Sequence, residues 1–273
     1  MTMHQKVYRV LSIAGSDSSG GAGIQADLKT FLANGVYGMS AVTALTAQNT
    51  TGVRAVQEAE PAFLAAQIDA VFEDIRPDAV KVGMVSSAAL VHVIAQRLKA
   101  HRAVHIVVDP VMAATSGASL MGETAGEVLA RELLPLAEVI TPNRGELEAL
   151  VGLSIWSRET MREAAHALQA KRGAAVLAKG GHFGADADDL LVTGPGEVGE
   201  RWFHGERLAN PNTHGTGCTL SSAIAANLAK GYALPDAVMR AKDYLTGAIQ
   251  ADLDLGHGSG PLDHAYALQS RFF

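Results

Sequence analysis

The chain has 273 residues, of which 48% are hydrophobic, enough to fill the core of one large α/β domain. Its 22 Lys and Arg against 28 Asp and Glu give a formal net charge of -6, which argues against nucleic acid and anionic membranes as partners. With a single cysteine, no secretory signal and no apolar run near the roughly 20 residues of a membrane helix, we expect a soluble cytoplasmic protein.

Buried strands and helices are predicted to alternate through the first two thirds of the chain. Strands are expected over residues 7–15, 39–50, 79–85, 104–110, 137–143 and 174–180, and helices over 23–35, 61–75, 87–100, 123–134 and 144–152. In the second helix Leu64, Ile68 and Phe72 recur on one face, as in an amphipathic helix. This alternation indicates an α/β fold with a mostly parallel sheet and helices on both faces.

The last third of the chain is expected to differ. Shorter strand-like segments at 188–194 and 201–208 predict an antiparallel edge to the sheet, and two helices are predicted at 216–230 and 235–252. No internal repeat or linker marks a boundary, so we expect a single domain over residues 1–273. By composition alone, the Gly-rich stretches 180–186 and 256–261 are candidate mobile segments.

Polar and glycine-rich residues gather where the predicted strands end, in GSDSSGGAG, AQNT, VGM, VVDPV, TPN and AKGGH. Ligands of open α/β sheets bind outside these carboxyl ends. The first stretch, residues 15–23, lets backbone N–H groups approach a ligand closely, but it matches neither the Walker A nor the GxGxxG pattern. A tight turn explains it equally well. Asp17 adds a charge to this loop, or else caps the following helix.

The stretch NTHGTGCT, residues 212–219, is a stronger signal. The turn Gly215-Thr216-Gly217 leads directly into a helix, so backbone N–H groups and the positive helix end converge on one point, as an anion site for phosphoryl transfer requires. Cys218 lies in the first helical turn, where we expect its thiol pKa to fall toward neutrality. The alternative is a cysteine that fills a gap in the core.

Five further residues have polar groups suited to a nucleotide or a ring. Asp109, Asn143 and Glu146 offer oxygen ligands for Mg²⁺, although Asp109 also suits a turn and Asn143 to Glu146 has the spacing of a helix capping box. Lys179 could contact phosphates or lie on the surface. Gln48 carries an amide that could pair with a heteroaromatic ring or could simply end a strand.

These segments together resemble the ribokinase-like superfamily and, within it, the hydroxymethylpyrimidine/phosphomethylpyrimidine kinases of thiamine biosynthesis. The resemblance spans nearly the whole chain, in the order GSDSSGGAGIQADLKTF, TALTAQNTTGV, KVGM, VVDPVM, ITPN, KGGH and NTHGTGCTLSSAIAANLAKG. Cys218, where most ribokinase relatives have Asp, makes the set specific. The resemblance implies a ribokinase-like three-layer α/β/α sandwich, with a mostly parallel central sheet and an antiparallel edge, and a homodimer.

The resemblance also implies an ATP-dependent kinase that uses Mg²⁺ and phosphorylates 4-amino-5-hydroxymethyl-2-methylpyrimidine to its monophosphate and then to the diphosphate. Gly215, Thr216 and Gly217 would form the anion hole, and Cys218 would be the general base facing the hydroxymethyl oxygen. Nucleotide phosphates would be bound by Asp109, Asn143, Glu146 and Lys179, with Mg²⁺ at Asp109 and Glu146. The pyrimidine pocket would be lined by Gly15, Asp17, Ala22, Gln48, Met84 and Val111.

Three alternatives stay open at this point. A pyridoxal/pyridoxine kinase uses the same scaffold for a hydroxymethyl group on a pyridine, and some relatives with Cys at this position accept both rings. A pyrimidine-binding regulator that has lost catalysis is disfavoured by Cys218, Glu146, Lys179 and the intact glycine turn. A nicotinamide-binding Rossmann domain is disfavoured because the first loop lacks the fingerprint spacing.

Overall fold

The computed structural model describes residues 6–112, 120–181, 186–194 and 199–268. An eight-stranded sheet forms its centre, in the spatial order β10-β9-β8-β7-β6-β5-β1-β2. The strands are β1 (Arg9–Ala14), β2 (Tyr37–Val42), β5 (Ala79–Val82), β6 (Ile106–Val108), β7 (Val139–Ile140), β8 (Ala175–Ala178), β9 (Asp189–Val192) and β10 (Glu200–Phe203). A separate antiparallel pair is formed by β3 (Ala44–Asn49) and β4 (Gly52–Glu58).

The sheet is parallel from β2 to β8 and antiparallel at β9 and β10. This arrangement confirms the predicted parallel sheet with an antiparallel edge. The central strands are mostly apolar because both of their faces are covered, and β5 and β8 are buried at every position, including Lys81 of β5. Apolar and polar residues alternate along a strand only when one of its faces is exposed to solvent.

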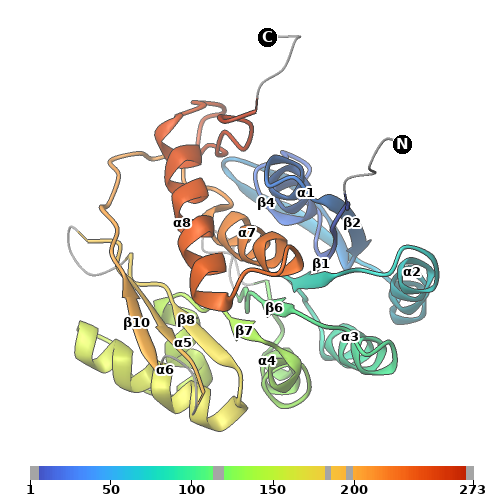
Figure 1. Cartoon of the computed structure of the whole chain (residues 1–273). Coiled ribbons are helices and arrows are strands. Elements are labelled where there is room, and N and C mark those ends of the chain that lie inside the picture. Colours follow the sequence, from blue (N-terminus) through green and yellow to red (C-terminus); the bar gives the residue numbers. More distant parts are fainter. Residues whose placement is uncertain (1–5, 113–119, 182–185, 195–198, 269–273) are drawn as a thin grey trace.

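Helices cover both faces of the sheet, which confirms the predicted three layers (Figure 1). On one face lie α1 (Gly23–Ala33), α7 (Thr216–Ala229) and α8 (Leu234–Gln250). On the other lie α2 (Pro61–Asp74), α3 (Ala88–Ala100), α4 (Glu123–Val128), α5 (Arg144–Val151) and α6 (Arg158–Arg172). Short π and 3₁₀ turns at Leu129–Leu133 and Leu134–Leu136 follow α4. Within the described ranges no helix has both the length and the hydropathy to cross a bilayer.

Two parts of the predicted element order were wrong or incomplete. The single strand expected over 39–50 is two strands, because the chain leaves the main sheet at Thr43 and β3 pairs with β4, a strand that we did not predict. Most of β4 is exposed, so it lacks the apolar pattern of a core strand. Helix α6 was also not predicted. Its buried residues Met161, Ala164, Ala165 and Leu168 have helical spacing, and Ser157 begins it with a capping box, so both signals were present in the sequence.

A buried ion pair lies between the central strands and the helices on one face. Lys81 of β5 is fully buried and its Nζ lies 2.8 and 2.9 Å from the carboxylate oxygens of Asp27 in α1. The hydroxyls of Ser12 in β1 and Ser222 in α7 donate to the same carboxylate. Burial alone would lower the pKa of Lys81, but Asp27 and other nearby acidic groups raise it overall, so the cation is retained.

We predict that Lys81→Met destabilises the fold by about 3–5 kcal/mol, because it leaves the Asp27 carboxylate buried without its cation. Lys81→Met/Asp27→Asn should recover part of that loss, since no uncompensated charge remains. Urea unfolding of the wild type, the single variant and the double variant measures both effects. A single variant as stable as the wild type would contradict a structural role for the pair.

Candidate active site

The carboxyl ends of the parallel strands bring most of the predicted site residues to one edge of the sheet (Figure 1). The segments concerned are Gly15–Asp17 after β1, Gly83–Met84 after β5, Asp109–Val111 after β6, Asn143 after β7 and Lys179 after β8. The N-terminus of α7 reaches the same region, since Cβ atoms built on Gly217 would lie 3.4 Å from Asp109 Oδ2 and from Lys179 Nζ. Sequence positions more than a hundred residues apart therefore converge on one site.

Asp109 and Lys179 form the charged floor of the site. Lys179 Nζ donates to Asp109 Oδ1 at 3.1 Å, and the Thr141 hydroxyl donates to the same oxygen at 3.1 Å. The Ser221 hydroxyl of α7 lies 3.4 Å from Asp109 Oδ2. Asp109 is buried and also begins a turn, in which its backbone carbonyl accepts from the Val111 N–H. The alternative of a surface position for Lys179 was wrong, because its Nζ is bonded to buried Asp109.

Glu146 and Asn143 begin α5 and lie next to Lys179. They form the capping box of α5, in which the Asn143 side chain accepts from the Glu146 N–H and Glu146 Oε2 accepts from the Asn143 N–H. The same Oε2 lies 4.0 Å from Lys179 Nζ. Burial raises the pKa of Glu146 to about 7; Lys179 opposes this rise and Asp109 adds to it. A carboxyl that titrates near neutrality beside a second carboxylate is an environment that additional positive charge would stabilise.

The turn that carries Lys179 is held by a residue that sequence reasoning missed. Asp189, the first residue of β9, accepts from the Gly180 N–H at 2.9 Å and from Lys242 of α8 at 2.5 Å. A Cβ at Gly180 would collide with the Asp188 carbonyl, so only glycine fits there. The sequence did contain a hint, since two consecutive aspartates, Asp188 and Asp189, stand where an apolar strand begins. Carboxylates are rarely buried in such a position without partners.

The start of α7 has the geometry expected of an anion site. Gly215 adopts φ +85° as the N-cap, and a Cβ at this position would collide with the Gly21 carbonyl of the first loop. The Thr216 N–H donates to the Thr213 carbonyl at 3.3 Å, so of the three predicted residues Thr216 already has a protein acceptor. The first turn of a helix leaves further N–H groups without intrahelical acceptors, and Gly217 of this turn lies beside Asp109 and Lys179.

Cys218 departs from the sequence-based expectation. Burial raises its thiol pKa to about 11, and the nearby charge of Lys81 only partly opposes this effect. The acidic groups of Asp27 and Asp109 raise it further. The expected shift toward neutrality was therefore wrong, and the thiol is protonated at neutral pH. The helix terminus was the correct location, but its dipole competes with desolvation and with two carboxylates that the sequence did not place nearby.

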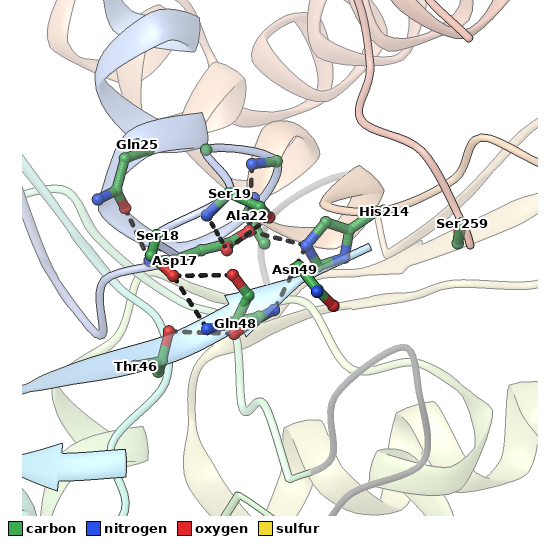
Figure 2. A network of polar contacts seen from close by, with 12 residues as sticks. Asp17, Ser18, Ser19, Ala22, Gln25, Thr46, Gln48, Asn49, His214 and Ser259 are labelled. Carbon is green, nitrogen blue, oxygen red and sulfur yellow. Dashed lines mark hydrogen bonds and ion pairs between the residues drawn. The ribbon is translucent and has the colours of Figure 1, made fainter. Parts of the chain in front are cut away.

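The first loop is organised around Asp17, as Figure 2 shows. Its carboxylate accepts from the Ser19 N–H and hydroxyl and from the N–H groups of Gly21 and Ala22. His214, the residue before the glycine turn, places Nε2 2.8 Å from Asp17 Oδ2. Burial would raise the pKa of Asp17, but His214, Ser19 and Ala22 hold it well below its usual range. His214 is a residue of this loop network that the sequence did not predict. Its position directly before the glycine turn is the one feature of the sequence that points to it.

Gln48 lies on β3, outside the main sheet, and leans over the first loop (Figure 2). Its Nε2 is 3.4 Å from His214 Nε2, and its Oε1 is 3.3 Å from the Thr46 hydroxyl. Because Asp17 is ionised and can only accept, His214 Nε2 must carry the proton that it shares with Asp17. It cannot then accept from Gln48, so the Gln48 N–H groups are not bonded to His214, while Gln48 Oε1 has the Thr46 hydroxyl as a neighbour.

The remaining predicted pocket residues lie close to this loop or to β6. A Cβ at Gly15 would lie 2.9 Å from Met84 Sδ, so these two residues touch. Ala22 immediately precedes α1. Val111 is half-buried in the turn after Asp109, and its N–H donates to the Asp109 backbone carbonyl at 2.8 Å. The predicted residues thus divide into a group around the first loop and a charged group at the base of α7.

Among the described residues no group of three or more His, Cys, Asp and Glu side chains could hold a metal ion. Asp109 and Glu146 are a pair of carboxylates beside one lysine. Such a pair suits Mg²⁺, which takes one or two protein carboxylates and completes its coordination with water and phosphate oxygens. The donor set therefore fits this ion, while a transition-metal site would require more protein ligands.

Comparison with known proteins gives a consistent result. The family model described as phosphomethylpyrimidine kinase matches residues 17–263. A hydroxymethylpyrimidine/phosphomethylpyrimidine kinase of Streptomyces coelicolor is 49% identical over 259 residues, with 95% of each chain covered. A thiamine biosynthesis bifunctional protein of Geobacter sulfurreducens is 50% identical over 95% of this chain, which spans 53% of that protein. The Staphylococcus aureus pyridoxal kinase solved with AMP-PCP and pyridoxal has a TM-score of 0.87 and 33% identity, covering 96% of this chain and 95% of that one.

We predict that Glu146 makes stability depend on pH between about 4.5 and about 7. In that range the folded state keeps a proton that the unfolded state has lost, so this contribution to the unfolding free energy is lost as pH rises. Glu146→Gln keeps an acceptor for the Asn143 N–H but cannot ionise. The free energy of unfolding of Glu146→Gln, relative to that of the wild type, should rise by roughly 1–3 kcal/mol from pH 5 to pH 7.5. Urea unfolding at several pH values tests this, and parallel stability curves would contradict it.

Proposed function

The chain belongs to the phosphomethylpyrimidine kinase family, and we propose from this membership and its site that it acts twice on one pyrimidine. It phosphorylates the hydroxymethyl group of 4-amino-5-hydroxymethyl-2-methylpyrimidine from ATP, and it then phosphorylates the resulting monophosphate to the diphosphate used in thiamine biosynthesis. The protein is a phosphotransferase. The observation that carries the proposal is the glycine turn at the start of α7, which faces Asp109 and Lys179 beside Cys218.

The glycine turn serves phosphoryl transfer through charge and position. The transferring group spreads negative charge over its equatorial oxygens, and the N–H groups and positive end of α7 stabilise that charge. Lys179 adds a positive charge at the same place, and its pKa is raised because Asp109 and Glu146 outweigh the effect of its burial. Gly217 gives the phosphoryl group access, because a larger side chain would fill the space between Asp109 and Lys179.

Cys218 lies in the first turn of α7, where an acceptor hydroxyl must approach the phosphate. With a thiol pKa of about 11, the residue does not act as a ready thiolate base in the free protein. The neutral thiol instead bounds the acceptor site. As the bond from phosphorus to the alcohol oxygen forms and the bond from phosphorus to the ADP oxygen breaks, the alcohol gives its proton to an oxygen of the transferring phosphoryl group. The second acceptor is already an anion and needs no base, so a residue that does not act as a base is compatible with both steps.

ATP and Mg²⁺ are the expected co-substrate and ion. Asp109 and Glu146 would hold Mg²⁺, with Asn143 and Lys179 beside the nucleotide phosphates. Bound there, the ion would neutralise phosphate charge during transfer. Glu146, whose pKa is raised to about 7, loses its proton more readily when positive charge is added nearby.

The part of the site around Gln48 and Asp17 would distinguish one substrate ring from another by hydrogen bonding and shape. Gln48 offers a donor and an acceptor on one amide, which matches a ring nitrogen and an adjacent exocyclic amine. Asp17, with His214, holds the loop beneath it. A pyridine ring carries a different edge, so this site supports the pyrimidine over pyridoxal. Pyridoxal kinase remains the second candidate, because a pyridoxal kinase shares the fold at a TM-score of 0.87.

We also propose a cytoplasmic homodimer. The apolar side chains of Leu45, Val56 and Phe63 are exposed on β3, β4 and the first turn of α2. These elements are adjacent in the chain, and β3 and β4 are paired. Apolar side chains left exposed on neighbouring elements suit contact with a second copy. The single free cysteine fits a reducing compartment.

The proposed function predicts ADP release from Mg-ATP with the pyrimidine alcohol and with its monophosphate, and products heavier by one phosphate in each case. A coupled assay with product masses tests this, with pyridoxal as the third acceptor. Turnover of pyridoxal alone would replace the assignment with the pyridoxal kinase. Silence with all three acceptors, from folded protein that binds the pyrimidine, would support the regulatory alternative.

We further predict that Cys218→Ala retains measurable turnover while Gly217→Val loses at least about 100-fold in kcat, because charge stabilisation contributes more than the base. Gly217→Ala is the matched control, since its Cβ would meet Asp109 and Lys179 at 3.4 Å, a tight but tolerable contact. Thermal unfolding of each variant separates catalysis from folding. Equal residual rates for Cys218→Ala and Gly217→Val would show that the division of roles is wrong.

A further inference from the structure

The segment GHGSGP, residues 256–261, has glycine at alternate positions, and we call it the tail strap. Its composition suggested a mobile piece, yet the structure ties it to two parts of the active site. The other candidate mobile piece, 180–186, lies largely outside the described residues. Gly256 and Gly258 of the strap are exposed to solvent, while Gly260 is buried. Burial of a core therefore cannot explain why glycine alternates here, and the specific contacts must.

The first contact is with the tip of the β3–β4 hairpin. Thr50 Oγ1 accepts from the His257 N–H and from the Gly258 N–H, both at 3.2 Å. A Cβ at Gly256 would overlap the Thr50 side chain, and a Cβ at Gly258 would overlap the Thr50 carbonyl. One hydroxyl thus collects two backbone donors, and two glycines allow the backbones to approach. Thr50 lies two residues after Gln48 in the chain.

The second contact is with the loop that precedes the glycine turn of α7. The Gly260 N–H donates to Asn212 Oδ1 at 2.9 Å, and the Gly260 carbonyl accepts from the His214 N–H at 3.1 Å. A Cβ at Gly260 would overlap the Asn212 amide oxygen. Ser259 accepts from the Thr213 N–H at 3.2 Å and donates to the Pro211 carbonyl. The strap therefore runs beside residues 211–214, and its last contact is with His214, the residue directly before Gly215.

These contacts place the strap between the two halves of the site. Gln48 belongs to the hairpin, which is not part of the main sheet and so is not positioned by it. His214 and Gly215 belong to the loop at the start of α7. The side chains of Gln48 and His214 approach within 3.4 Å, but this pair provides no strong hydrogen bond. The first loop links them indirectly, since Ser18 bonds the Gln48 backbone and Asp17 bonds His214. The strap adds a second connection, which runs from the hairpin tip at Thr50 to residues 211–214.

We propose that the tail strap is a positioning element for the acceptor ring, and that Thr50 and Gly256 are its positioning residues. It sets the Gln48 amide at a constant distance from the phosphoryl-binding turn, so that a ring held by Gln48 presents its hydroxymethyl group to the phosphate. Neither residue touches the reacting atoms. This proposal rests on the function proposed above, because it assigns the strap to that acceptor site.

The test is Thr50→Val, which keeps the shape of threonine but removes the acceptor of two N–H groups, with Thr50→Ser as the variant that retains it. Steady-state kinetics should show a rise of about 5- to 10-fold in KM for the pyrimidine alcohol with Thr50→Val. KM for ATP should stay within about twofold, because the charged floor of the site is untouched. Thr50→Ser should resemble the wild type in both.

A matched glycine pair separates contact from backbone strain. Gly256 and Gly231 both have positive φ, at +92° and +87°, but only Gly256 faces Thr50, while nothing lies within 4 Å of a Cβ at Gly231. Gly256→Ala should raise KM for the alcohol as Thr50→Val does, and Gly231→Ala should not. Equal effects of the two alanine variants would attribute the result to strain and overturn the proposal.

Amide hydrogen exchange of the ligand-free protein gives a readout independent of turnover. Thr50→Val should speed exchange in residues 44–58 and 211–215, and Thr50→Ser should not. An unchanged KM for the alcohol, equal rises in both KM values, or unchanged exchange would each overturn the proposal. If the wild type turns over no acceptor, the proposed function fails, while faster exchange confined to these two segments would still support the strap as the link between them.

Discussion

The buried ion pair of Lys81 and Asp27 joins the elements on which the site depends. It connects β5 to α1, and the hydroxyls of Ser12 and Ser222 extend it to β1 and α7. An ion pair in a core tolerates little displacement, because each charge depends on the other for its solvation. The N-terminus of α7 is thus held at a constant height relative to the strand ends.

The site built on this base has two chemically different ends. Asp109, Glu146 and Lys179 form a charged end beneath the glycine turn. The acceptor end is uncharged where the ring would bind, and its one carboxylate, Asp17, is neutralised by N–H groups and His214. A doubly acting kinase needs this separation, because the phosphate charge must be stabilised while the ring is recognised by neutral hydrogen bonds.

Cys218 shows how local and tertiary effects compete. Its place at a helix N-terminus favours the thiolate, but burial and the carboxylates of Asp27 and Asp109 outweigh that preference. A similar case is the pair Asn143 and Glu146, for which the sequence offered either a helix capping box or a nucleotide site. In the structure the pair forms the capping box, and the same arrangement places Glu146 beside Lys179. Hydrogen bonds that cap a helix also orient a carboxylate, so the two interpretations do not exclude each other.

The layered α/β architecture, the parallel sheet with its antiparallel edge, and the strand ends as the candidate site could all be predicted from the amino-acid sequence. Apolar runs, helical periodicity and glycine turns are local signals, and each is complete within about ten residues. Four features could not be predicted without the packed fold: the hairpin of β3 and β4, the bond of His214 to Asp17, the Asp189 contact with Gly180, and the protonated thiol of Cys218. These depend on pairs of residues far apart in the chain, whose burial and neighbours arise only when the layers pack.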